Sequence, residues 1–358
     1  MAALKRGILT KEMMMKKLAL LFCATTALAA CGSNNSGSSS AQVRVVGSST
    51  VYPFTTVVAE EFQRANPGTS VIVESTGTGA GIKLFCGGVG GEFPDMVNAS
   101  RQMKKSEYDA CVAAGAKEVI EYPVGIDGLT IIEANSAQPM NLTIADIYKA
   151  LAANPFGKGP NTAQTWKDVN PSLPAVKIRV LGPPPTSGTR DSLAELILEK
   201  GCDSDPAMKE LKKTDSDKHK DVCTKIREDG LFVEAGENDN LLVQKVSADP
   251  GTLGVLGYSF LEENADKVRA VSLGGIAPTE ATISNLQYPG ARKLYIYVKG
   301  EHLKAKPAIR EFFAAYARAG AKGGPLEGRG LVPFSGADAE AATKQANELK
   351  PLDPATLK

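Results

Sequence analysis

The pattern of apolar and polar positions predicts strands and helices that alternate along the chain. Residues 43–46 form an apolar run typical of a buried strand, and residues 51–65 carry apolar side chains three or four positions apart, the spacing of one helix face. The sequence Asn-Pro-Gly-Thr at 66–69 ends this helix in a turn, and residues 70–74 are expected to form the next strand. This order of elements is that of an α/β protein.

The alternation continues through the rest of the chain. A long β-rich run at 119–134 contains Gly125 and Gly128, and the charge-dense stretch 205–230 is typical of a solvated helical surface. Elsewhere the sequence predicts strands at 95–98, 176–182 and 292–300, helices at 82–86, 105–114, 143–151, 188–201 and 307–320, and a helix, a turn and a strand within 239–261. The chain shows no internal repeat.

The first 42 residues differ from this pattern. The stretch MKKLALLFCATTALAACGS, which starts at Met15, has a Lys pair, a short apolar run and small residues before Cys31, so residues 1–30 are expected to be a signal peptide. Leu28-Ala29-Ala30-Cys31 matches a lipobox, which predicts a lipid on Cys31; the alternative is an ordinary signal peptide with an incidental cysteine. The Gly/Ser/Asn-rich segment 31–42 is expected to be a flexible tether.

Length and charge narrow the function classes. The 358 residues suffice for two domains or one large one, and 43% hydrophobic with 23% charged residues is ordinary for a soluble globular protein. The formal net charge is +1 and becomes slightly negative once residues 1–30 are removed. This charge gives no general basic field, so no nucleic-acid partner is expected.

Four cysteines remain beyond the signal and the lipobox, and an even number in an exported protein predicts disulfides. Three pairings are possible, and we expect the local one, Cys86–Cys111 with Cys202–Cys223, because it closes two short loops. The alternative is a metal site that uses His219 with Cys223. A closed site normally needs four ligands, and the sequence offers no further Cys/His cluster, so no metal is expected.

Three Gly- and Ser/Thr-rich motifs stand at predicted strand-to-helix turns: GSST (47–50), STGTGAG (75–81) and PTSGTRD (185–191). A helix start offers unpaired N–H groups and a partial positive charge, glycine permits close approach, and hydroxyls add donors, so the motifs together predict a site for a small anion. The alternative for each motif alone is an ordinary helix cap. Arg101 follows the predicted strand at 95–98, and Arg190 lies in the third motif, at the start of its predicted helix. Both would supply guanidinium groups for an oxyanion.

In this order, GSSTVYPF (47–54), STGTGAG (75–81), NASR (98–101), VGIDGL (124–129), SGTRD (187–191) and GTLGVLGY (251–258) resemble motifs of a known family. The family is that of the PstS-type phosphate-binding lipoproteins of bacterial ABC phosphate transporters, type II periplasmic substrate-binding proteins. The resemblance covers about residues 42–300. It implies an α/β, two-lobed Venus-flytrap fold with mixed sheets flanked by helices and phosphate in the cleft between the lobes.

The resemblance also implies two hinge crossings, which we place near 125–128 and 254–258. We therefore expect lobe 1 to comprise residues 43–126 and 257–358, the latter with the C-terminal helices, and lobe 2 to comprise residues 127–256.

Ligand roles carry over residue by residue onto the matching motifs. The phosphate-binding residues implied are Ser49, Thr50, Val51, Thr76, Gly77, Thr78, Ser100, Arg101, Ser187, Gly188, Thr189 and Arg190. Better-known members have Asp where this chain has Arg101, and an Arg where it has Pro183. Arg101 and Arg190 are expected to replace that Arg and to dominate the affinity.

The proton-accepting carboxylate of the family therefore needs another position. Asp127, flanked by two glycines at the first crossing, is the expected acceptor. The alternative is a hinge aspartate that only caps a turn, with Glu237 and Asp239 as further candidates for the acceptor.

The expected function is capture of inorganic phosphate and delivery to an ABC phosphate permease in the inner membrane. The resemblance implies a monomer without cofactor or metal, lipid-anchored to a bacterial membrane in the periplasm or at the cell surface. No catalysis is expected, because only His219 and His302 offer a base, both in Lys-rich stretches expected to be exposed, and neither a Gly-x-Ser-x-Gly elbow nor a P-loop lysine is present. The alternatives are a binder of another oxyanion such as sulfate, a phosphate-ester hydrolase, or a structural or adhesive lipoprotein.

Overall fold

Nine strands form one mixed sheet in the computed structural model, which describes residues 42–185, 187–236 and 238–357. The strand order is β2-β1-β3-β11-β4-β8-β6-β7, with β9 paired to β4, and a separate two-stranded sheet joins β5 to β10. The strands are β1 (Gln42–Gly47), β2 (Ser70–Ser75), β3 (Met96–Ala99), β4 (Val119–Ala134), β5 (Asn141–Leu142), β6 (Val180–Gly182), β7 (Phe232–Glu234), β8 (Leu253–Gly257), β9 (Val268–Ala270), β10 (Ser272–Leu273) and β11 (Ala291–Lys299). The predicted α/β fold with mixed sheets is confirmed.

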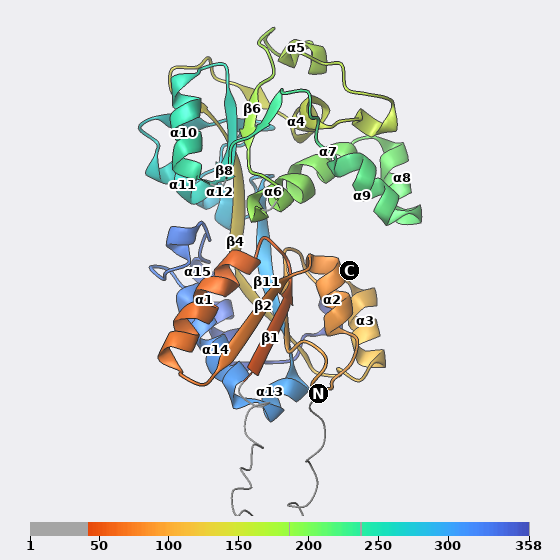
Figure 1. The fold of residues 1–358 in the computed structure, drawn as a ribbon, viewed down its shortest axis with the longest axis vertical. Helices are drawn as coiled ribbons and strands as arrows, with labels where there is room; N and C mark the ends of the chain where they lie inside the picture. Colours follow the sequence, from red (N-terminus) through yellow and green to blue (C-terminus); the bar gives the residue numbers. More distant parts are fainter. Residues whose placement is uncertain (1–41, 186, 237, 358) are drawn as a thin grey trace, which may run out of the picture. The chain divides into compact units, whose positions relative to one another are not determined.

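The first lobe is built on β1, β2, β3, β11 and the first part of β4 (Figure 1). Successive residues of β1 face opposite sides of the sheet, so Val45 packs in one apolar core and Val46 in another. Helices α1 and α14 cover the first side, and α2 and α3 cover the second. The helices of this lobe are α1 (Tyr52–Ala65), α2 (Thr78–Phe85), α3 (Lys105–Ala113), α13 (Gly300–Ala305), α14 (Pro307–Ala319) and α15 (Gly336–Glu348), with short 3-10 turns at η4 (Glu327–Arg329) and η5 (Pro354–Thr356).

The second lobe is built on β8, β6 and β7, which are parallel, together with the second part of β4 and β9. The predicted helix at 188–201 is interrupted: α6 (Gly188–Ser192) passes into a π-helical turn, η3 (Leu193–Leu198), and then into α7 (Glu199–Cys202). The remaining helices are α4 (Ile144–Leu151), η2 (Pro155–Gly157), α5 (Trp166–Val169), α8 (Pro206–Thr214), α9 (Ser216–Thr224), α10 (Asp239–Ala248), α11 (Tyr258–Glu263) and α12 (Glu280–Ser284). The charge-dense stretch forms α8 and α9, mostly exposed as predicted.

Two neighbouring strands carry the chain between the lobes (Figure 1). Strand β4 pairs with β11 as far as Gly128, and with β8 from Leu129 onward, so the strand changes partners next to Gly128. The return crossing lies at the start of β11, beside the first, because Ala291 pairs with Gly128 and the Leu129 N–H donates to the Gly290 carbonyl at 2.9 Å.

This return is later than the predicted crossing at 254–258. Strand β8 lies inside the second lobe, where it pairs with both β4 and β6. Strand β9 also pairs with the far end of β4, at Ile132–Ala134, so the chain is still in the second lobe after residue 257. The glycine-rich segment 254–258 was expected to cross between the lobes, but most of it belongs to β8, which pairs on both sides within the second lobe.

Among the described residues, no helix combines the length and the apolar character that crossing a membrane requires. The predicted signal peptide, the lipobox cysteine Cys31 and nearly all of the tether lie outside the described residues.

A buried lysine lies at the end of the first lobe's sheet. Lys299, the last residue of β11, is fully buried, lies over the rings of Phe85 and Phe93, and donates to the Pro94 carbonyl at 2.9 Å. Burial lowers the pKa of the Lys299 ammonium to about 8, and the charge of Asp95 opposes this shift without cancelling it.

The pH dependence of stability should therefore change in Lys299→Met. The pKa of Lys299 is lower in the folded than in the unfolded protein, so folding is penalised below pH 8 and the penalty disappears as the pH rises toward about 10.4. The shift corresponds to about 3 kcal/mol. Urea unfolding between pH 7.5 and 10.5 should show this gain in the wild type and in a Lys304→Met control, whose lysine is exposed, but not in Lys299→Met. Parallel curves for all three proteins would refute the assignment.

Candidate functional site

An arginine and an aspartate form a cross-strand pair where the two crossing strands meet. Arg292 of β11 stands opposite Asp127 of β4 in the antiparallel register, one residue from each crossing. The Arg292 Nε donates to Asp127 Oδ2 at 3.1 Å, and the two side chains are only 10% and 16% exposed. Opposite charges that face each other across two strands support each other, and their partial burial strengthens the attraction.

The remaining nitrogens of the Arg292 guanidinium reach both lobes. Nη2 donates to Thr50 Oγ1 of the first lobe at 3.0 Å and to Ser192 Oγ of the second at 2.9 Å. Nη1 donates to Glu195 Oε2. Ser192 Oγ also donates to Asp127 Oδ2 at 2.7 Å, so the aspartate fixes the orientation of the guanidinium from behind. Arg292 is therefore the point at which groups of both lobes converge.

Carboxylates of the second lobe accept hydrogen bonds from hydroxyl groups of the first lobe. The Ser49 hydroxyl, just before α1, donates to Asp191 Oδ2 of α6. The Ser100 hydroxyl donates to Glu195 Oε2 at 2.9 Å and also lies 2.9 Å from Thr78 Oγ1. One oxygen of Glu195 thus accepts from both Ser100 and Arg292, which is the arrangement that an oxygen of a bound anion would adopt.

The helix starts of the first lobe are open to an anion. Neither α1 nor α2 has a side-chain cap or an acidic residue in its first turn, so the positive ends of both helices are uncompensated by their own residues. Helix α6 differs, because Ser187 caps it by accepting from the Thr189 N–H at 3.2 Å.

Two glycines allow the close packing of these loops. A Cβ on Gly188 would lie 2.8 Å from the Ser49 carbonyl oxygen, so only glycine lets α6 approach the loop before α1. Gly47 has φ of +123°, and a Cβ there would lie 2.2 Å from the Asn98 oxygen. A side chain at either position would separate the motifs that the sequence had singled out.

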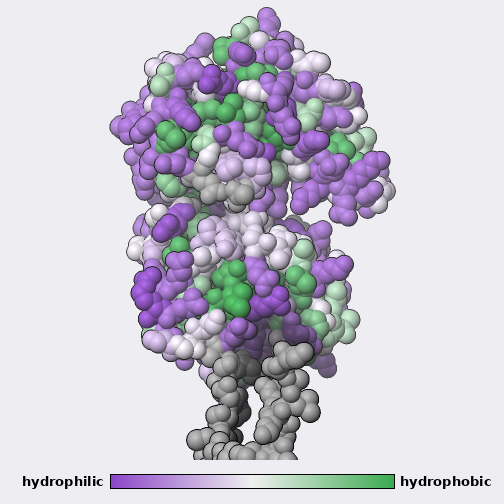
Figure 2. Space-filling view, viewed as in Figure 1, coloured by the Kyte–Doolittle hydropathy of each residue, from purple (hydrophilic) through white to green (hydrophobic). Residues whose placement is uncertain are grey.

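These groups line a cleft of about 890 Å³ between the lobes. Ser49, Thr78, Ser100 and Arg292 lie along it from the first lobe, and Asp191 and Glu195 from the second. In Figure 2 the surface is hollowed at one edge of the view, between the part that carries α8 and α9 and the part that carries α2, and hydrophilic residues border the hollow.

The two arginines singled out from the sequence have other partners. Arg101 lines the cleft, but its guanidinium is bidentate to Glu107 at 2.9 and 2.7 Å. Burial opposes the charged form of Arg101, but the hydrogen bond and charge of Glu107 outweigh it, so the pKa of Arg101 is raised.

Arg190 does not line the cleft. It donates to the Pro183 carbonyl at 2.9 Å, lies 3.5 Å from Glu234 and stacks on the Phe232 ring, where burial lowers its pKa. The expectation that these two arginines dominate an anion site conflicts with this geometry, because the central position belongs to Arg292.

The other predicted residues fall into three groups. Ser49, Thr76, Gly77, Thr78 and Ser100 line the cleft. Thr50, Asp127 and Gly188 lie against its closed end through Arg292 and the close approach of α6, and Thr50 Oγ1 donates to the Gly188 carbonyl at 3.4 Å. Val51, Ser187, Thr189 and Arg190 do not line it: Val51 is fully buried, and Ser187 caps α6. Of the other acceptor candidates, Glu237 lies outside the described residues, and Asp239 begins α10.

Sequence reasoning did not single out Ser48, Asp191, Ser192, Glu195 or Arg292. The available signal for Arg292 was a cation, followed by Lys293, at the start of a strand whose centre is apolar, and only the register with β4 shows that Arg292 lies at the site. Asp191 and Glu195 lie one turn apart on a helix that the π turn interrupts, so the ordinary 3.6-residue period does not place them securely. Burial, and secondarily the charge of Glu195, raises the pKa of the Asp191 carboxyl.

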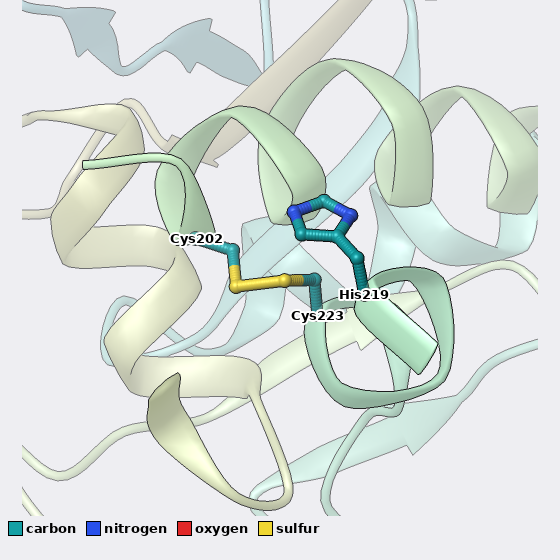
Figure 3. Close-up of side chains that lie close together, drawn as sticks. All are labelled: Cys202, His219 and Cys223. Atoms are coloured by element: carbon teal, nitrogen blue, oxygen red, sulfur yellow. A yellow bond between two sulfur atoms is a disulfide. The ribbon is translucent and has the colours of Figure 1, made fainter. Parts of the chain in front are cut away.

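The cysteines and histidines form separate structural clusters. Disulfides join Cys86 to Cys111 and Cys202 to Cys223, the predicted local pairing. Figure 3 shows His219 beside the second disulfide, whose sulfurs are bonded to each other, which removes the two thiolates that a metal site would need.

Both histidines are buried, not exposed as predicted. His219 is hydrogen-bonded to Asp203 at 2.8 Å, and His302 is hydrogen-bonded to Asp95 at 2.6 Å. These carboxylate partners satisfy the polar rings in the interior.

Comparisons with known proteins point to one family. A family model described as a PBP superfamily domain matches residues 32–317. Protein SphX of Synechococcus elongatus is 35% identical over 85% of this chain and 81% of its own length, and the phosphate-binding protein PstS of Staphylococcus saprophyticus is 29% identical over 81% of each. A crystal structure of a possible phosphate binding protein from Planctomyces limnophilus superposes with a TM-score of 0.71 at 30% identity, covering 87% of this chain and 99% of the other. The resemblance stated from the motifs is confirmed.

The disulfides give a direct chemical prediction. Alkylation of the folded protein under non-reducing conditions, followed by peptide mass mapping, should leave Cys86, Cys111, Cys202 and Cys223 unlabelled, because all four sulfurs are in disulfides. The same experiment after reduction and unfolding should label all four and serves as the control. Label on Cys202 or Cys223 without reduction would instead revive the thiolate–histidine metal site.

Proposed function

This chain belongs to the PBP superfamily, and we propose that it is an exported receptor that binds one inorganic phosphate ion between its lobes and delivers it to an ABC phosphate permease. The observation that carries the proposal is the Glu195 oxygen, which accepts from Arg292 and Ser100 at the closed end of the cleft. An anionic oxygen is already bound there by a guanidinium and a hydroxyl. The names of the relatives, which include phosphate-binding proteins, support phosphate as the anion.

Phosphate would enter by displacing Glu195. The Glu195 side chain is 34% exposed, whereas Arg292 is 10% exposed and held from behind by Asp127, so the glutamate is the member of the pair that is free to move outward. The ion would then accept from Arg292 Nη1 and from the hydroxyls of Ser49, Thr50, Thr78 and Ser100. Backbone donors at the starts of α1 and α2, including that of Val51, would complete the first lobe's share, with the Thr76 hydroxyl in the adjoining loop. Gly77 would contribute by allowing close approach, because its N–H already donates to the Gly47 carbonyl at 2.8 Å.

The second lobe would close over the ion through the start of α6. Gly188 already lies against the loop that holds Ser49, so Ser187, Gly188 and Thr189 need only a small rearrangement to donate to the same anion. Neither lobe has a complete set of donors, which favours binding coupled to lobe closure. In this proposal Arg101 borders the entrance and Arg190 braces α6 against Phe232, so neither supplies the main cation.

Discrimination against sulfate requires an acceptor for the proton that phosphate retains at neutral pH. Asp127 Oδ2 already accepts hydrogen bonds from Arg292 Nε and Ser192 Oγ. We therefore propose that the role of Asp127 is to orient the Arg292 guanidinium. Asp191 faces the cleft beside Ser49, and burial raises the pKa of its carboxyl, which favours acceptance of a proton there. We therefore propose Asp191 as the group that reads the phosphate proton.

The cellular setting is also proposed from the sequence. The signal peptide and lipobox at residues 1–31 support export and a lipid anchor on Cys31, in the periplasm or at the surface of a bacterial membrane. A monomeric receptor without cofactor or metal fits this role. Catalysis is not proposed, because each histidine is already hydrogen-bonded to a carboxylate, His219 to Asp203 and His302 to Asp95. A second oxyanion such as sulfate remains the alternative ligand, and the Asp191 experiment described below separates the two.

Replacing the central cation should weaken phosphate binding. A hydrogen bond to a charged group is worth about 1.5–3 kcal/mol, so Arg292→Lys, which keeps the charge but loses the fork of donors, should raise the phosphate Kd at least about tenfold. Arg190→Lys is the matched control and should change the Kd by less than about threefold. Isothermal titration calorimetry measures both, with thermal unfolding to verify that each variant is folded. A large loss in Arg190→Lys and none in Arg292→Lys would restore the assignment made from the sequence.

The proton acceptor is tested by comparing two amides. Asp191→Asn should lower the ratio of phosphate to sulfate affinity by roughly tenfold or more, because the amide donates to an unprotonated oxygen and no longer repels sulfate. Asp127→Asn should weaken both anions together, since it only loosens Arg292. Competition titrations with the two anions at pH 7 measure the ratios. A ratio that falls in Asp127→Asn alone would make Asp127 the acceptor instead.

A further inference from the structure

The Glu195 carboxylate needs a new partner when phosphate takes its place at Arg292. In the structure Glu195 Oε2 accepts from Arg292 Nη1 and from the Ser100 hydroxyl, the latter at 2.9 Å. Glu195 Oε1 accepts no hydrogen bond from the described residues. Moving a carboxylate away from a guanidinium is costly unless another charged group receives it, so the groups around Glu195 affect how readily it is displaced.

Arg101 lies beside this contact. It follows Ser100 in the chain, so its Cα is about 3.8 Å from the Cα of a residue that already binds Glu195. Arg101, Ser100 and Glu195 all line the cleft. The Arg101 side chain is 37% exposed and that of Arg292 only 10%, so Arg101 is the more outward of the two arginines. Burial opposes the charged form of Arg101, but Glu107 and then the charge of Glu195 favour it, and its pKa is raised.

The Arg101 guanidinium has donors to spare. A guanidinium can bind a carboxylate end-on through Nη1 and Nη2 or side-on through Nε and Nη2. Arg101 binds Glu107 end-on, at 2.9 and 2.7 Å, and Nη1 also donates to the Gln102 carbonyl at 3.1 Å. Its side-on donors, Nε and the second N–H of Nη2, have no acceptor among the described residues. Arg44 shows the side-on mode in this protein, because its Nε and Nη2 donate to Glu74 at 2.8 and 3.4 Å. Arg101 can therefore bind a second carboxylate while Glu107 keeps it oriented.

We propose that Arg101 receives the Glu195 carboxylate when phosphate displaces it from Arg292, so that Arg101 is a positioning residue that favours phosphate binding without touching the anion. The carboxylate oxygens of Glu195 then accept from Nε and Nη2 of Arg101, and Glu107 keeps its end-on contact. Arg101 belongs to the first lobe and Glu195 to the second, so the exchange replaces one bond between the lobes with another. The inference rests on the proposed phosphate site and adds the partner of the displaced glutamate.

The test is a double-mutant cycle of Arg101→Met and Glu195→Gln, with each protein titrated calorimetrically with orthophosphate. In the wild-type background Arg101→Met should raise the phosphate Kd at least about fivefold, because the displaced carboxylate loses its partner. Glu195→Gln should lower the Kd, because the competing charge is gone, and in that background Arg101→Met should change the Kd by less than about twofold. Lys104→Met is the control: this exposed lysine lines the same cleft, and its loss should change the Kd by less than about twofold in either background.

The outcomes separate this inference from the proposed function. An equal loss from Arg101→Met in both backgrounds would mean that Arg101 acts on the anion itself, and no loss in either would mean that it serves only Glu107. Both results refute the exchange and leave the function intact. A wild-type protein that does not bind phosphate would contradict the function, and the exchange with it.

A structural measurement tests the same exchange without any variant. In crystals of the wild-type protein grown with phosphate, a Glu195 carboxylate oxygen should lie within hydrogen-bond distance of Arg101 Nε or Nη2. Thermal unfolding of each variant verifies that it is folded before its Kd is compared. Phosphate at Arg292 with Glu195 directed to solvent, or to a lysine of its own lobe, would overturn the proposal.

Discussion

The cross-strand pair of Arg292 and Asp127 is the interaction on which the site depends. It lies where the only two paired strands that join the lobes in the described chain run side by side, so its position relative to both lobes is set by backbone hydrogen bonds. Asp127 holds the guanidinium from one side, and groups from both lobes accept from it on the other. A cation fixed at this point attracts an anion from either lobe, and its partial burial makes that attraction stronger than at the surface.

This arrangement also requires something negative to stay close to Arg292. Leaving part of a largely buried guanidinium without a partner is costly. Asp127 pairs with its Nε, and in the absence of an external anion the Glu195 carboxylate, which also accepts from the Ser100 hydroxyl, pairs with its Nη1. In the proposed site phosphate would therefore compete with an internal ligand, so its affinity would reflect the difference between two bound anions. Without ligand, the Asp191 and Glu195 carboxylates connect the lobes through Ser49, Ser100 and Arg292. The same hydroxyls and guanidinium are the donors proposed for the anion that displaces Glu195.

Most of the fold could be predicted from the sequence, because apolar periodicity and turn residues act locally. The helix at 105–113 and the long strand β4 matched within a residue or two. The site could be predicted only in part: the hydroxyl motifs carry a local signal, but Arg292 lies about 165 residues from Asp127, and only the strand register joins them. The same limit explains Arg190, which looked like a ligand beside its motif and instead stacks on Phe232.

A crystal structure of the protein with phosphate tests the central claim most directly. The account predicts phosphate at the crossing strands, with one oxygen within hydrogen-bond distance of Arg292 Nη1 and Ser100 Oγ and the Glu195 carboxylate moved away from both. Asp127 should keep its contact with Arg292 Nε. Phosphate bound elsewhere in the cleft, with the Arg292–Glu195 pair intact, would contradict the account.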